Sequence, residues 1–467
     1  MTGEKQKDRK VAKETCKNVY KRLDTEECGG GVDIDFNNEF KAAFKEMEGT
    51  FNHVYITGRA GTGKSTLLKY FKENTGKKVV VLAPTGVAAV NVGGQTIHSF
   101  FGFPPRYIDP RNIRRSRNKK LVEKLDTVII DEVSMVRADL MDGVDYALRI
   151  NRDEMKKPFG GAQMIFFGDL FQLSPVLDKE SREVMGEIYE SPYFFHSKVF
   201  TDLDLSFFEL QKNYRQSDKK FIDLLNKCRA NECEDDDIML LNERIDKKAI
   251  EEKDGRVILT ATNNVASRIN YKRLSELPGR KQKYDAAVSG NFDEKLYPTD
   301  AALELKKGAQ IMLIRNDPKK RWVNGTIAEI SDLQKDIVEV CIRGNKYEVS
   351  PVTWNKIKYT YSKKENRIEE DIVGSFSQIP IKLAWAITIH KSQGQTFDRV
   401  VIELGYGAFA HGQVYVALSR CKTLEGIYLN RPVIHSDIIF DERIHEFSDR
   451  FHRNNGDRHY EEIEIIR

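Results

Sequence analysis

The segment that most constrains this chain is residues 58–65, which read Gly-Arg-Ala-Gly-Thr-Gly-Lys-Ser. It matches the pattern G-x-x-x-x-G-K-[ST], and it lies between an apolar run at 51–57 and a predicted helix. The glycines let backbone N–H groups wrap a chain of phosphates, and the start of the helix adds a partial positive charge. The segment therefore predicts a nucleoside-triphosphate site on an α/β fold.

The same pattern assigns roles to single residues. Lys64 is expected to reach the β- and γ-phosphates, and the hydroxyl of Ser65 is expected to bind Mg²⁺. A second apolar run ends in Asp131, a candidate for the Mg²⁺ shell, and Glu132, a candidate to orient or deprotonate the attacking water. The loop residues expected around ATP are Gly58, Ala60, Gly61, Thr62, Gly63, Lys64, Ser65 and Thr66.

Apolar runs alternate with polar clusters through both halves of the chain. The predicted strands are 51–57, 77–83, 127–131 and 162–167 in the first half, and 204–210, 256–262, 381–388, 399–404 and 426–430 in the second. This alternation is typical of α/β domains with parallel sheets, in which ligands bind where the strands end. Between 305 and 378, short strands with turns such as Asn324-Gly325 predict a small all-β insertion.

Composition excludes several classes of protein. The 467 residues suggest two to four domains, and a hydrophobic content of 40% excludes a wholly disordered chain. No apolar run approaches the ~20 residues of a membrane span. The six cysteines lack zinc-site spacing or a disulfide framework, which favours free thiols in a reducing compartment. The net charge of +4 does not by itself indicate a nucleic-acid binder.

Hydrolysis of ATP also needs groups that stabilise charge on the γ-phosphate. Gln172 follows a predicted strand and is the candidate sensor, although a loop glutamine can equally lack such a role. Arg215 and Arg420 follow apolar segments of the second half; they are arginine fingers if that half faces ATP, and surface salt-bridge partners otherwise. The expected catalytic residues are Lys64, Asp131, Glu132, Gln172, Arg215 and Arg420.

Several different short motifs lie along the chain and are recognisable as a set. They are Gly58–Ser65, Asp131–Met135, Gly168–Leu173, Asn213–Arg215, His390–Gly394 and Ala417–Arg420, with 83–89, 94–100 and 158–161 between them. From about residue 36 to 430, the set resembles superfamily 1 helicases of group B, and within them the Pif-type (petite integration frequency) DNA helicases. The resemblance adds Gln393 and Gly394 to the ATP site. Ser174 stands where members often have proline.

The resemblance implies an ATP- and Mg²⁺-dependent helicase that moves 5′ to 3′ on single-stranded DNA and unwinds duplexes, with G-quadruplexes and DNA–RNA hybrids as further candidates. It implies two RecA-like motor domains and a Src-homology-3-like β-barrel. The expected segments are a basic tail (1–35), motor domain 1 (36–200) with a wedge at about 101–121, motor domain 2 (201–304 and 379–440), the barrel (305–378) and a C-terminal tail (441–467). The family's adenine-reading glutamine is not evident, and Asn37 or Asn38 is the candidate replacement.

A single-strand track needs cations for phosphates and flat groups for bases. Residues 102–120 hold seven cations against Asp109 alone, and form either a wedge at the duplex junction or a solvated basic loop. A second basic cluster lies at 306–322, where Trp322 either contacts DNA or caps a hairpin. The expected DNA-binding residues, mostly by resemblance, are Thr85, Gly86, His98, Ser99, Asn263, Trp322, His390 and Lys391.

The expected partners are single-stranded DNA and fork junctions, bound by a monomer that can dimerise on DNA, without a membrane. The expected location is the cytoplasm, with the nucleoid, in a bacterium or phage; nucleus and mitochondrion remain open. Three alternatives also remain: an ATPase or translocase without strand separation, a clamp-loader-like scaffold, and a phosphotransferase. The second α/β half argues against the last two. The acidic stretch 232–237 is read as the start of a helix.

Overall fold

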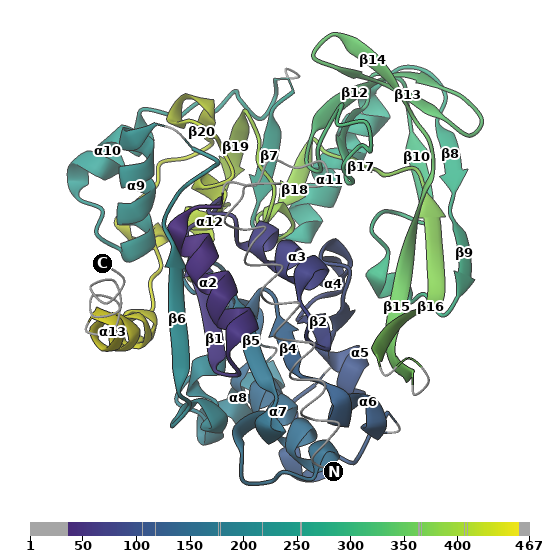
Figure 1. The fold of residues 1–467 in the computed structure, drawn as a ribbon. Coiled ribbons are helices and arrows are strands. Elements are labelled where there is room, and N and C mark those ends of the chain that lie inside the picture. Colours follow the sequence, from purple (N-terminus) through teal and green to yellow (C-terminus); the bar gives the residue numbers. More distant parts are fainter. Residues whose placement is uncertain are drawn as a thin grey trace.

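The computed structural model describes residues 36–456, apart from positions 105, 117, 176, 178, 217, 253–254, 363–364, 366, 406 and 409. The predicted tail at 1–35 and the end of the C-terminal tail at 457–467 lie outside the described residues. Two parallel sheets carry helices around them, and a β-rich insertion stands beside the second sheet (Figure 1). The predicted α/β class is confirmed.

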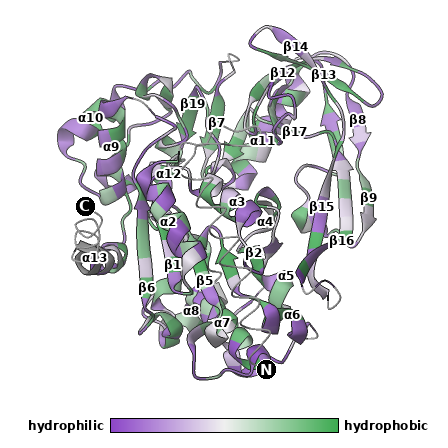
Figure 2. Ribbon diagram, viewed as in Figure 1, coloured by the Kyte–Doolittle hydropathy of each residue, from purple (hydrophilic) through white to green (hydrophobic). Residues whose placement is uncertain are grey.

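The first sheet has six parallel strands in the order β3-β2-β4-β5-β1-β6. Their bounds are β1 (His53–Gly58), β2 (Val79–Ala83), β3 (Gln95–Thr96), β4 (Thr127–Ile130), β5 (Gln163–Phe167) and β6 (Leu205–Leu210). β4 and β5 are buried at every position, because the strands of a parallel sheet are covered on both faces. Figure 2 accordingly shows these central strands as largely hydrophobic.

Helices cover both faces of this sheet. On one face, α2 (Asn38–Gly49) and α3 (Lys64–Asn74) bring the rings of Phe44 and Phe71 to 5.6 Å, and on the other α7 (Ala138–Arg152) buries Met141. α2 begins at Asn38 because the side chain of Asn37 accepts the N–H of Phe40 at 2.8 Å. Shorter helices complete this half: α4 (Gly86–Asn91), α5 (Ile97–Phe101), α6 (Lys119–Lys124) and α8 (Lys179–Ile188).

β6 belongs to the first sheet, so the expectation that 204–210 opens the second motor domain is wrong. β6 pairs in parallel with β1 along its whole length, from His53↔Leu205 to Gly58↔Leu210. A boundary at residue 200 would cut this strand from its sheet. Alternating patterns show that a strand exists, but they do not show which sheet it joins; the remaining domain boundaries stay predictions.

The second sheet has four parallel strands in the order β18-β7-β19-β20. They are β7 (Val257–Thr260), β18 (Ala386–Thr388), β19 (Val400–Glu403) and β20 (Ile427–Leu429). The predicted single strand 381–388 is two strands, because β17 (Ile381–Leu383) pairs antiparallel with β11 of the insertion whereas β18 pairs parallel with β7. Helices of this half are α9 (Lys219–Ala230), α10 (Asp235–Asn242), α11 (Asn263–Glu276) and α12 (Gln413–Leu418).

The insertion contains a five-stranded sheet in the order β14-β13-β12-β11-β17. Its other strands are β11 (Gln310–Leu313), β12 (Ile327–Leu333), β13 (Val338–Ile342) and β14 (Asn345–Val349). The expected short strands are therefore confirmed, and their inward side chains, such as Ile330 and Val340, are fully buried. Further strands lie before the predicted start of the insertion at residue 305, since β8 (Gln282–Asp285) pairs with β10 (Ala302–Leu305).

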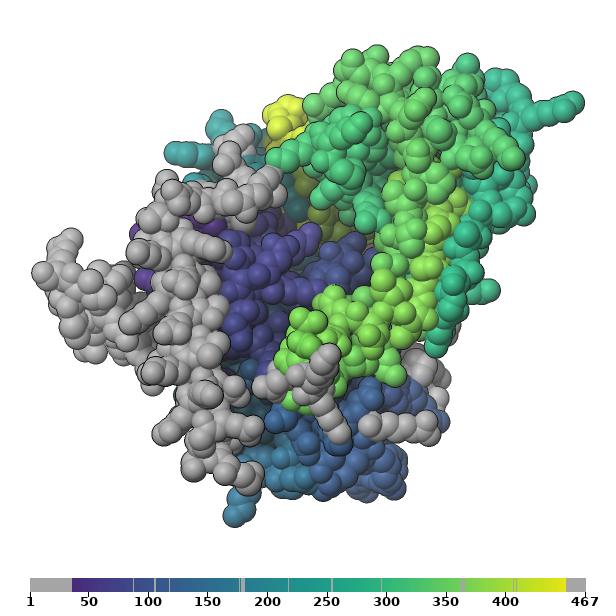
Figure 3. Space-filling model, turned by 45° about the vertical axis from the view of Figure 1, so that its right-hand side comes forward, coloured from purple at the N-terminus to yellow at the C-terminus, as the bar shows by residue number. Residues whose placement is uncertain are grey.

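A long hairpin, which the predicted strands did not include, leaves the insertion and reaches the first half. We call β15 (Val352–Ser362) and β16 (Arg367–Gln378) the hairpin arm; β16 also pairs with β9 (Ala287–Gly290). The hydroxyl of Tyr359 accepts the N–H of Val81 at 3.2 Å, and the N–H of Tyr359 donates to Oε1 of Gln95 at 3.3 Å. Figure 3 shows the yellow-green arm against the blue first half.

The C-terminal helix α13 (Glu442–Gly456) forms the first part of the predicted tail and returns to the first half. Its Phe447 ring lies 4.5 Å from the ring of Phe195, and Ile444 is fully buried. The acidic stretch also behaves as predicted, because Glu234 and Asp237 form a capping box at the start of α10. Within 36–456, none of the described helices combines the length and apolar character needed to cross a bilayer.

Candidate nucleotide site and nucleic-acid interface

A cavity of about 700 Å³ lies between the two sheets, where the strands of the first sheet end. It brings together most of the residues expected at ATP. Its wall includes Ala60, Gly61, Thr62, Gly63, Lys64, Ser65, Thr66, Glu132, Gln172 and Arg215 from the first half, and Gly394 and Arg420 from the second. Of the expected set, Gly58, Asp131 and Gln393 do not line the cavity; the amide nitrogen of Gln393 is buried without a partner among the described residues.

The loop 58–65 is folded as its glycines require. Gly61 has a φ of +88°, and a Cβ built there would lie 2.6 Å from the Cβ of Arg215, so only glycine fits. α3 begins at Lys64, which directs its N-terminus into the cavity. Nζ of Lys64 donates to the carbonyls of Gly58 (2.5 Å) and Arg59 (3.0 Å). Burial lowers the pKa of Lys64, which Asp169 and Glu132 oppose.

The acid pair follows β4. Glu132 has a φ of +50°, an unusual backbone conformation for a non-glycine residue of the kind found at active sites. Burial raises the pKa of Glu132, against the opposing effects of Lys64 and Arg420, so the site holds a carboxylate that is a stronger base than usual. Burial, and then the charge of Glu132, raise the pKa of Asp131 to about 7.

The oxygen donors fit Mg²⁺ that arrives with the nucleotide. Mg²⁺ prefers oxygen ligands and usually keeps waters and phosphate oxygens beside one or two protein groups. Ser65 and Asp131 offer one hydroxyl and one carboxylate, and no group of three or more His, Cys, Asp or Glu that could hold a metal occurs in the described part of the chain. Because burial and the charge of Glu132 raise the pKa of Asp131, a divalent cation bound beside this carboxylate would favour its ionised form.

Arg215 and Arg420 approach the cavity from different halves. Because β6 is in the first sheet, Arg215 comes from the first half, contrary to our expectation that both arginines lie in the second. Its Nη1 donates to the carbonyl of Ser419 at 3.2 Å. Arg420 is only 1% exposed, and its Nε donates to the carbonyl of Val416 at 2.9 Å. Burial, followed by Arg215, lowers the pKa of Arg420 to about 9.

One end of the cavity is formed by α2 and the segment after β6. Asn37, Phe40 and Tyr214 line it, and Asn37 Nδ2 donates to the Tyr214 hydroxyl at 3.3 Å. Since the Asn37 oxygen caps α2, this amide is already largely committed. Asn38 is exposed and does not line the cavity. Of the two candidate adenine readers, the structure therefore brings only Asn37 to the cavity.

The sheet order separates the nucleotide residues from the expected DNA residues. Within the first sheet, β4, β5, β1 and β6 are adjacent and lead into the cavity, whereas β2 and β3 form the other edge. β2 leads to Thr85 and Gly86, and β3 leads to His98 and Ser99. In the second sheet, the adjacent strands β7 and β18 lead to Asn263, His390 and Lys391. In each sheet, the expected DNA residues therefore follow two strands that are neighbours in that sheet.

The local contacts of these residues differ. Thr85 caps α4 by accepting the N–H of Ala88 at 3.2 Å, and Gly86 packs so closely on Leu296 that an added Cβ would lie 2.2 Å away. Ser99, Asn263 and Lys391 are exposed, while burial lowers the pKa of His98 and of His390. Trp322 is 8% exposed and packs in the core of the insertion beside Tyr347. The structure therefore favours the hairpin role of Trp322 over the proposed base contact.

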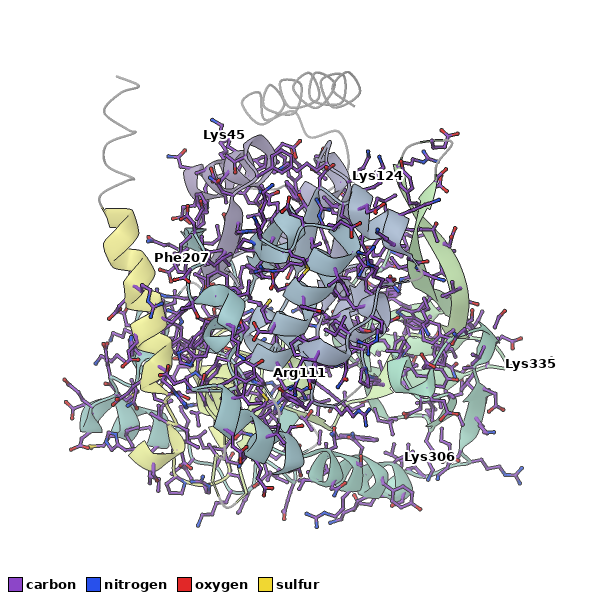
Figure 4. All side chains as sticks on the ribbon, turned by 90° about the horizontal axis from the view of Figure 1, so that it is seen from below. Lys45, Arg111, Lys124, Phe207, Lys306 and Lys335 are labelled. Carbon is purple, nitrogen blue, oxygen red and sulfur yellow. The ribbon has the colours of Figure 1, made fainter. Side chains whose placement is uncertain are left out.

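The basic segment 102–120 is partly neutralised. Arg111 pairs with Asp109 at 2.8 Å, and Arg115 and Lys119 both pair with Asp153. Arg117 lies outside the described residues. Three cations form no ion pair with any described residue: Arg106, Arg114 and Lys120. The second predicted basic cluster, at 306–322, is separate from the segment 102–120, as the positions of Lys306 and Arg111 in Figure 4 show. Lys306 is buried, and its Nζ donates to the carbonyl of Leu277 at 2.6 Å.

Comparison with known proteins agrees with this arrangement. A family model described as PIF1-like helicase matches residues 35–238, and one described as UvrD-like helicase C-terminal domain matches 383–427. The ATP-dependent DNA helicase Pif1 of Bdellovibrio bacteriovorus is 33% identical over 389 residues, which cover 81% of this chain and 84% of the relative. This chain belongs to the Pif1-like helicase family. Human ATP-dependent DNA helicase PIF1 is 34% identical over 80% of the chain, which spans 57% of that longer relative.

Solved structures of Bacteroides Pif1 share the fold of this Pif1-like chain. The unliganded structure gives a TM-score of 0.83 at 36% identity, covering 89% of this chain and 97% of that one. The structure bound to single-stranded DNA gives a TM-score of 0.66 at 36% identity, covering 91% and 98%. The arrangement described here is therefore nearer to the DNA-free form of that helicase.

Three residues of this Pif1-like chain that sequence reasoning missed carry contacts between segments distant in the sequence. Tyr415 on α12 contacts the phosphate loop, Arg229 on α9 pairs with Asp169 after β5, and Tyr359 docks the hairpin arm. The role of Tyr415 could have been predicted, since this residue lies two positions before the Ala417–Arg420 motif. Arg229 and Tyr359 stand in unremarkable helix and strand patterns, and nothing in the sequence marks them.

Proposed function

We propose that this chain is an ATP-dependent DNA helicase that moves 5′ to 3′ on single-stranded DNA and separates duplexes at forks. The observation that carries the proposal is the cavity between the two sheets, which unites the phosphate loop and Glu132 of one half with Arg420 of the other. An ATPase made from one α/β half would need no second wall. The names of the relatives, and the DNA in the Bacteroides complexes, support DNA as the polymer.

The chemistry follows from the residues at the cavity. The N–H groups of the loop and Lys64 bind the phosphates, and Arg215 and Arg420 place positive charge where charge develops on the γ-phosphate. Glu132 accepts a proton from the attacking water, because burial has made its carboxylate more basic. Mg²⁺, held through Ser65 and Asp131, would neutralise phosphate charge.

Movement along DNA follows from the two halves sharing one nucleotide. ATP attracts Arg420 toward the phosphate loop and so favours closure, and loss of the γ-phosphate removes that attraction. The DNA residues at β2, β3, β7 and β18 then separate and approach once in each cycle. The basic segment 102–120 is proposed as the wedge, and the five-stranded sheet as the Src-homology-3-like barrel. A monomer suffices for this cycle; pairing of two copies at a fork remains an extension of the proposal, suggested by a Bacteroides complex described as two coordinating Pif1 helicases.

The decisive experiment compares ATP hydrolysis with and without single-stranded DNA, followed by unwinding of duplexes that carry a 5′ or a 3′ tail. We expect DNA to stimulate hydrolysis and only the 5′-tailed duplex to be unwound. Glu132→Gln should bind ATP and DNA with nearly unchanged affinity yet fail to unwind. Stimulated hydrolysis without strand separation would instead establish a translocase. Hydrolysis indifferent to DNA would refute the helicase assignment.

A further inference from the structure

Asp169, which follows β5, carries a negative charge in the interior between the two sheets. Its side chain is fully buried, and burial alone would raise its pKa, but Arg229 and Lys64 more than offset this and lower the pKa. A buried carboxylate that stays ionised needs hydrogen-bond donors on both oxygens. The donors to Asp169 therefore identify the segments that this carboxylate holds together.

The donors come from both halves of the molecule. Nη2 of Arg229, on α9, lies 3.3 Å from Oδ1, and the guanidinium stacks 3.9 Å above the ring of Phe171. Nε2 of Gln172 donates to Oδ2 at 3.2 Å. The hydroxyl of Tyr415, on α12 of the second half, donates to the same Oδ2 at 3.5 Å. Asp169 therefore joins the expected γ-phosphate sensor to a helix of the opposite half.

Tyr415 makes a second contact that closes the connection. Its hydroxyl accepts the N–H of Ala60, in the phosphate loop, at 3.3 Å. Burial, and then the charge of Asp169, raise the pKa of Tyr415 to about 12, so the hydroxyl keeps its proton at neutral pH and can donate to the carboxylate while accepting from Ala60. Tyr415 is 4% exposed, so both hydrogen bonds lie in the interior of the protein.

We propose that Tyr415 and Arg229 are positioning residues for ATP hydrolysis, which hold Asp169 and, through it, orient the carboxamide of Gln172 in the wall of the nucleotide cavity. Because a carboxylate only accepts hydrogen bonds, Asp169 commits one N–H of Gln172 and thereby sets which way the amide faces. Since Tyr415 belongs to the second half, this orientation is complete only when the two halves are together. The inference rests on the ATPase activity proposed above.

The test removes one hydroxyl and asks whether its effect passes through Gln172. Tyr415→Phe, Gln172→Ala and the double variant are compared by steady-state ATP hydrolysis at saturating single-stranded DNA. The matched control is Tyr428→Phe on β20, whose ring stacks on Arg256 away from the cavity. We expect Tyr415→Phe to lower kcat about tenfold, because the carboxamide of Gln172 loses its fixed orientation. KM for ATP and the melting temperature should stay close to those of the control, because Gln172 and Arg229 still donate to the two oxygens of Asp169.

The double variant separates positioning from a structural role. If Tyr415 acts through Gln172, the double variant should match Gln172→Ala alone, because the group being oriented is already gone. Multiplicative losses, an unchanged kcat in Tyr415→Phe, or a parallel fall of kcat and melting temperature would each overturn the proposal. Arg229→Lys, which keeps the positive charge beside Asp169, should retain a higher kcat than Arg229→Gln. A wild-type chain that fails to hydrolyse ATP would refute the proposed function itself, a result distinct from all of these.

Discussion

Arg215, in the segment after β6, donates a hydrogen bond to the carbonyl oxygen of Ser419, the residue immediately before Arg420, at 3.2 Å. One candidate finger thus holds the backbone that carries the other. The contact crosses from the first half to the second, so the positive charge that the two arginines bring to the cavity depends on how closely the halves approach.

Replacing Arg215 with alanine should lower kcat for ATP hydrolysis by about 10³-fold, because a charge that stabilises the transition state is lost. The affinity for ATP should change far less, since Lys64 and the loop N–H groups remain. Steady-state hydrolysis at saturating DNA measures both quantities. Arg343→Ala removes an exposed arginine paired with Asp398, outside the cavity, and should behave as wild type. An Arg215→Ala variant with normal kcat would exclude the finger role.

The unpaired cations of the basic segment should count as phosphate contacts. Mutating Arg106, Arg114 and Lys120 together to alanine should reduce the slope of log affinity against log salt by about two, at roughly 0.7 for each single-strand phosphate. The matched triple variant replaces Arg111, Arg115 and Lys119, whose charges are already opposed by Asp109 and Asp153. Fluorescence anisotropy with a labelled single strand over a salt series gives both slopes. Equal slopes in the two variants would mean that pairing does not decide which cations meet DNA.

Releasing the hairpin arm should strengthen DNA binding. Tyr359 is 2% exposed and joins the arm to Val81 and Gln95 in an arrangement closer to an unliganded relative than to its DNA complex. If DNA binding separates these contacts, Tyr359→Ala should lower the apparent Kd by about two- to tenfold, because the docked form competes with the binding-competent one. Thr360→Ala, the adjacent residue of the same strand, is the control. A weaker or unchanged affinity in Tyr359→Ala would show that the arm stays docked when DNA binds.

Stability should fall in acid through His53. Its Nδ1 accepts the N–H of Met164 at 3.1 Å, so only the neutral ring fits, and burial lowers its pKa to about 4 from the usual 6.5. The unfolded chain then binds more protons between these values, and the free energy of unfolding decreases as pH falls from 6.5 to 4, by at most about 3 kcal/mol. Urea unfolding over this range should show the slope in the wild type and a shallower one in His53→Gln. Parallel slopes would assign the acid sensitivity to other groups.

Much of the nucleotide site was predictable because it consists of short contiguous motifs at strand ends. Lys64, Glu132 and Gln172 each follow a strand whose apolar pattern is visible, and parallel strands bring their ends together. What could not be predicted depends on pairing between distant segments. β6 and β17 have ordinary strand patterns, yet β6 pairs with the first sheet and β17 pairs with the sheet of the insertion. Trp322 looked available for DNA because aromatic residues serve both as core and as stacking surface, and only packing decides between these uses.

The return of α13 to the first half has a mechanical consequence. The chain leaves the first sheet after β6, builds the whole second sheet and the insertion, and comes back to place Phe447 on Phe195. The second half is therefore anchored to the first at both of its ends. These two attachment points permit rotation about the line between them and oppose translation, whereas the docked hairpin arm is a third contact that restrains this rotation. The expected opening of the nucleotide cavity is therefore a rotation of the second half that accompanies release of the arm.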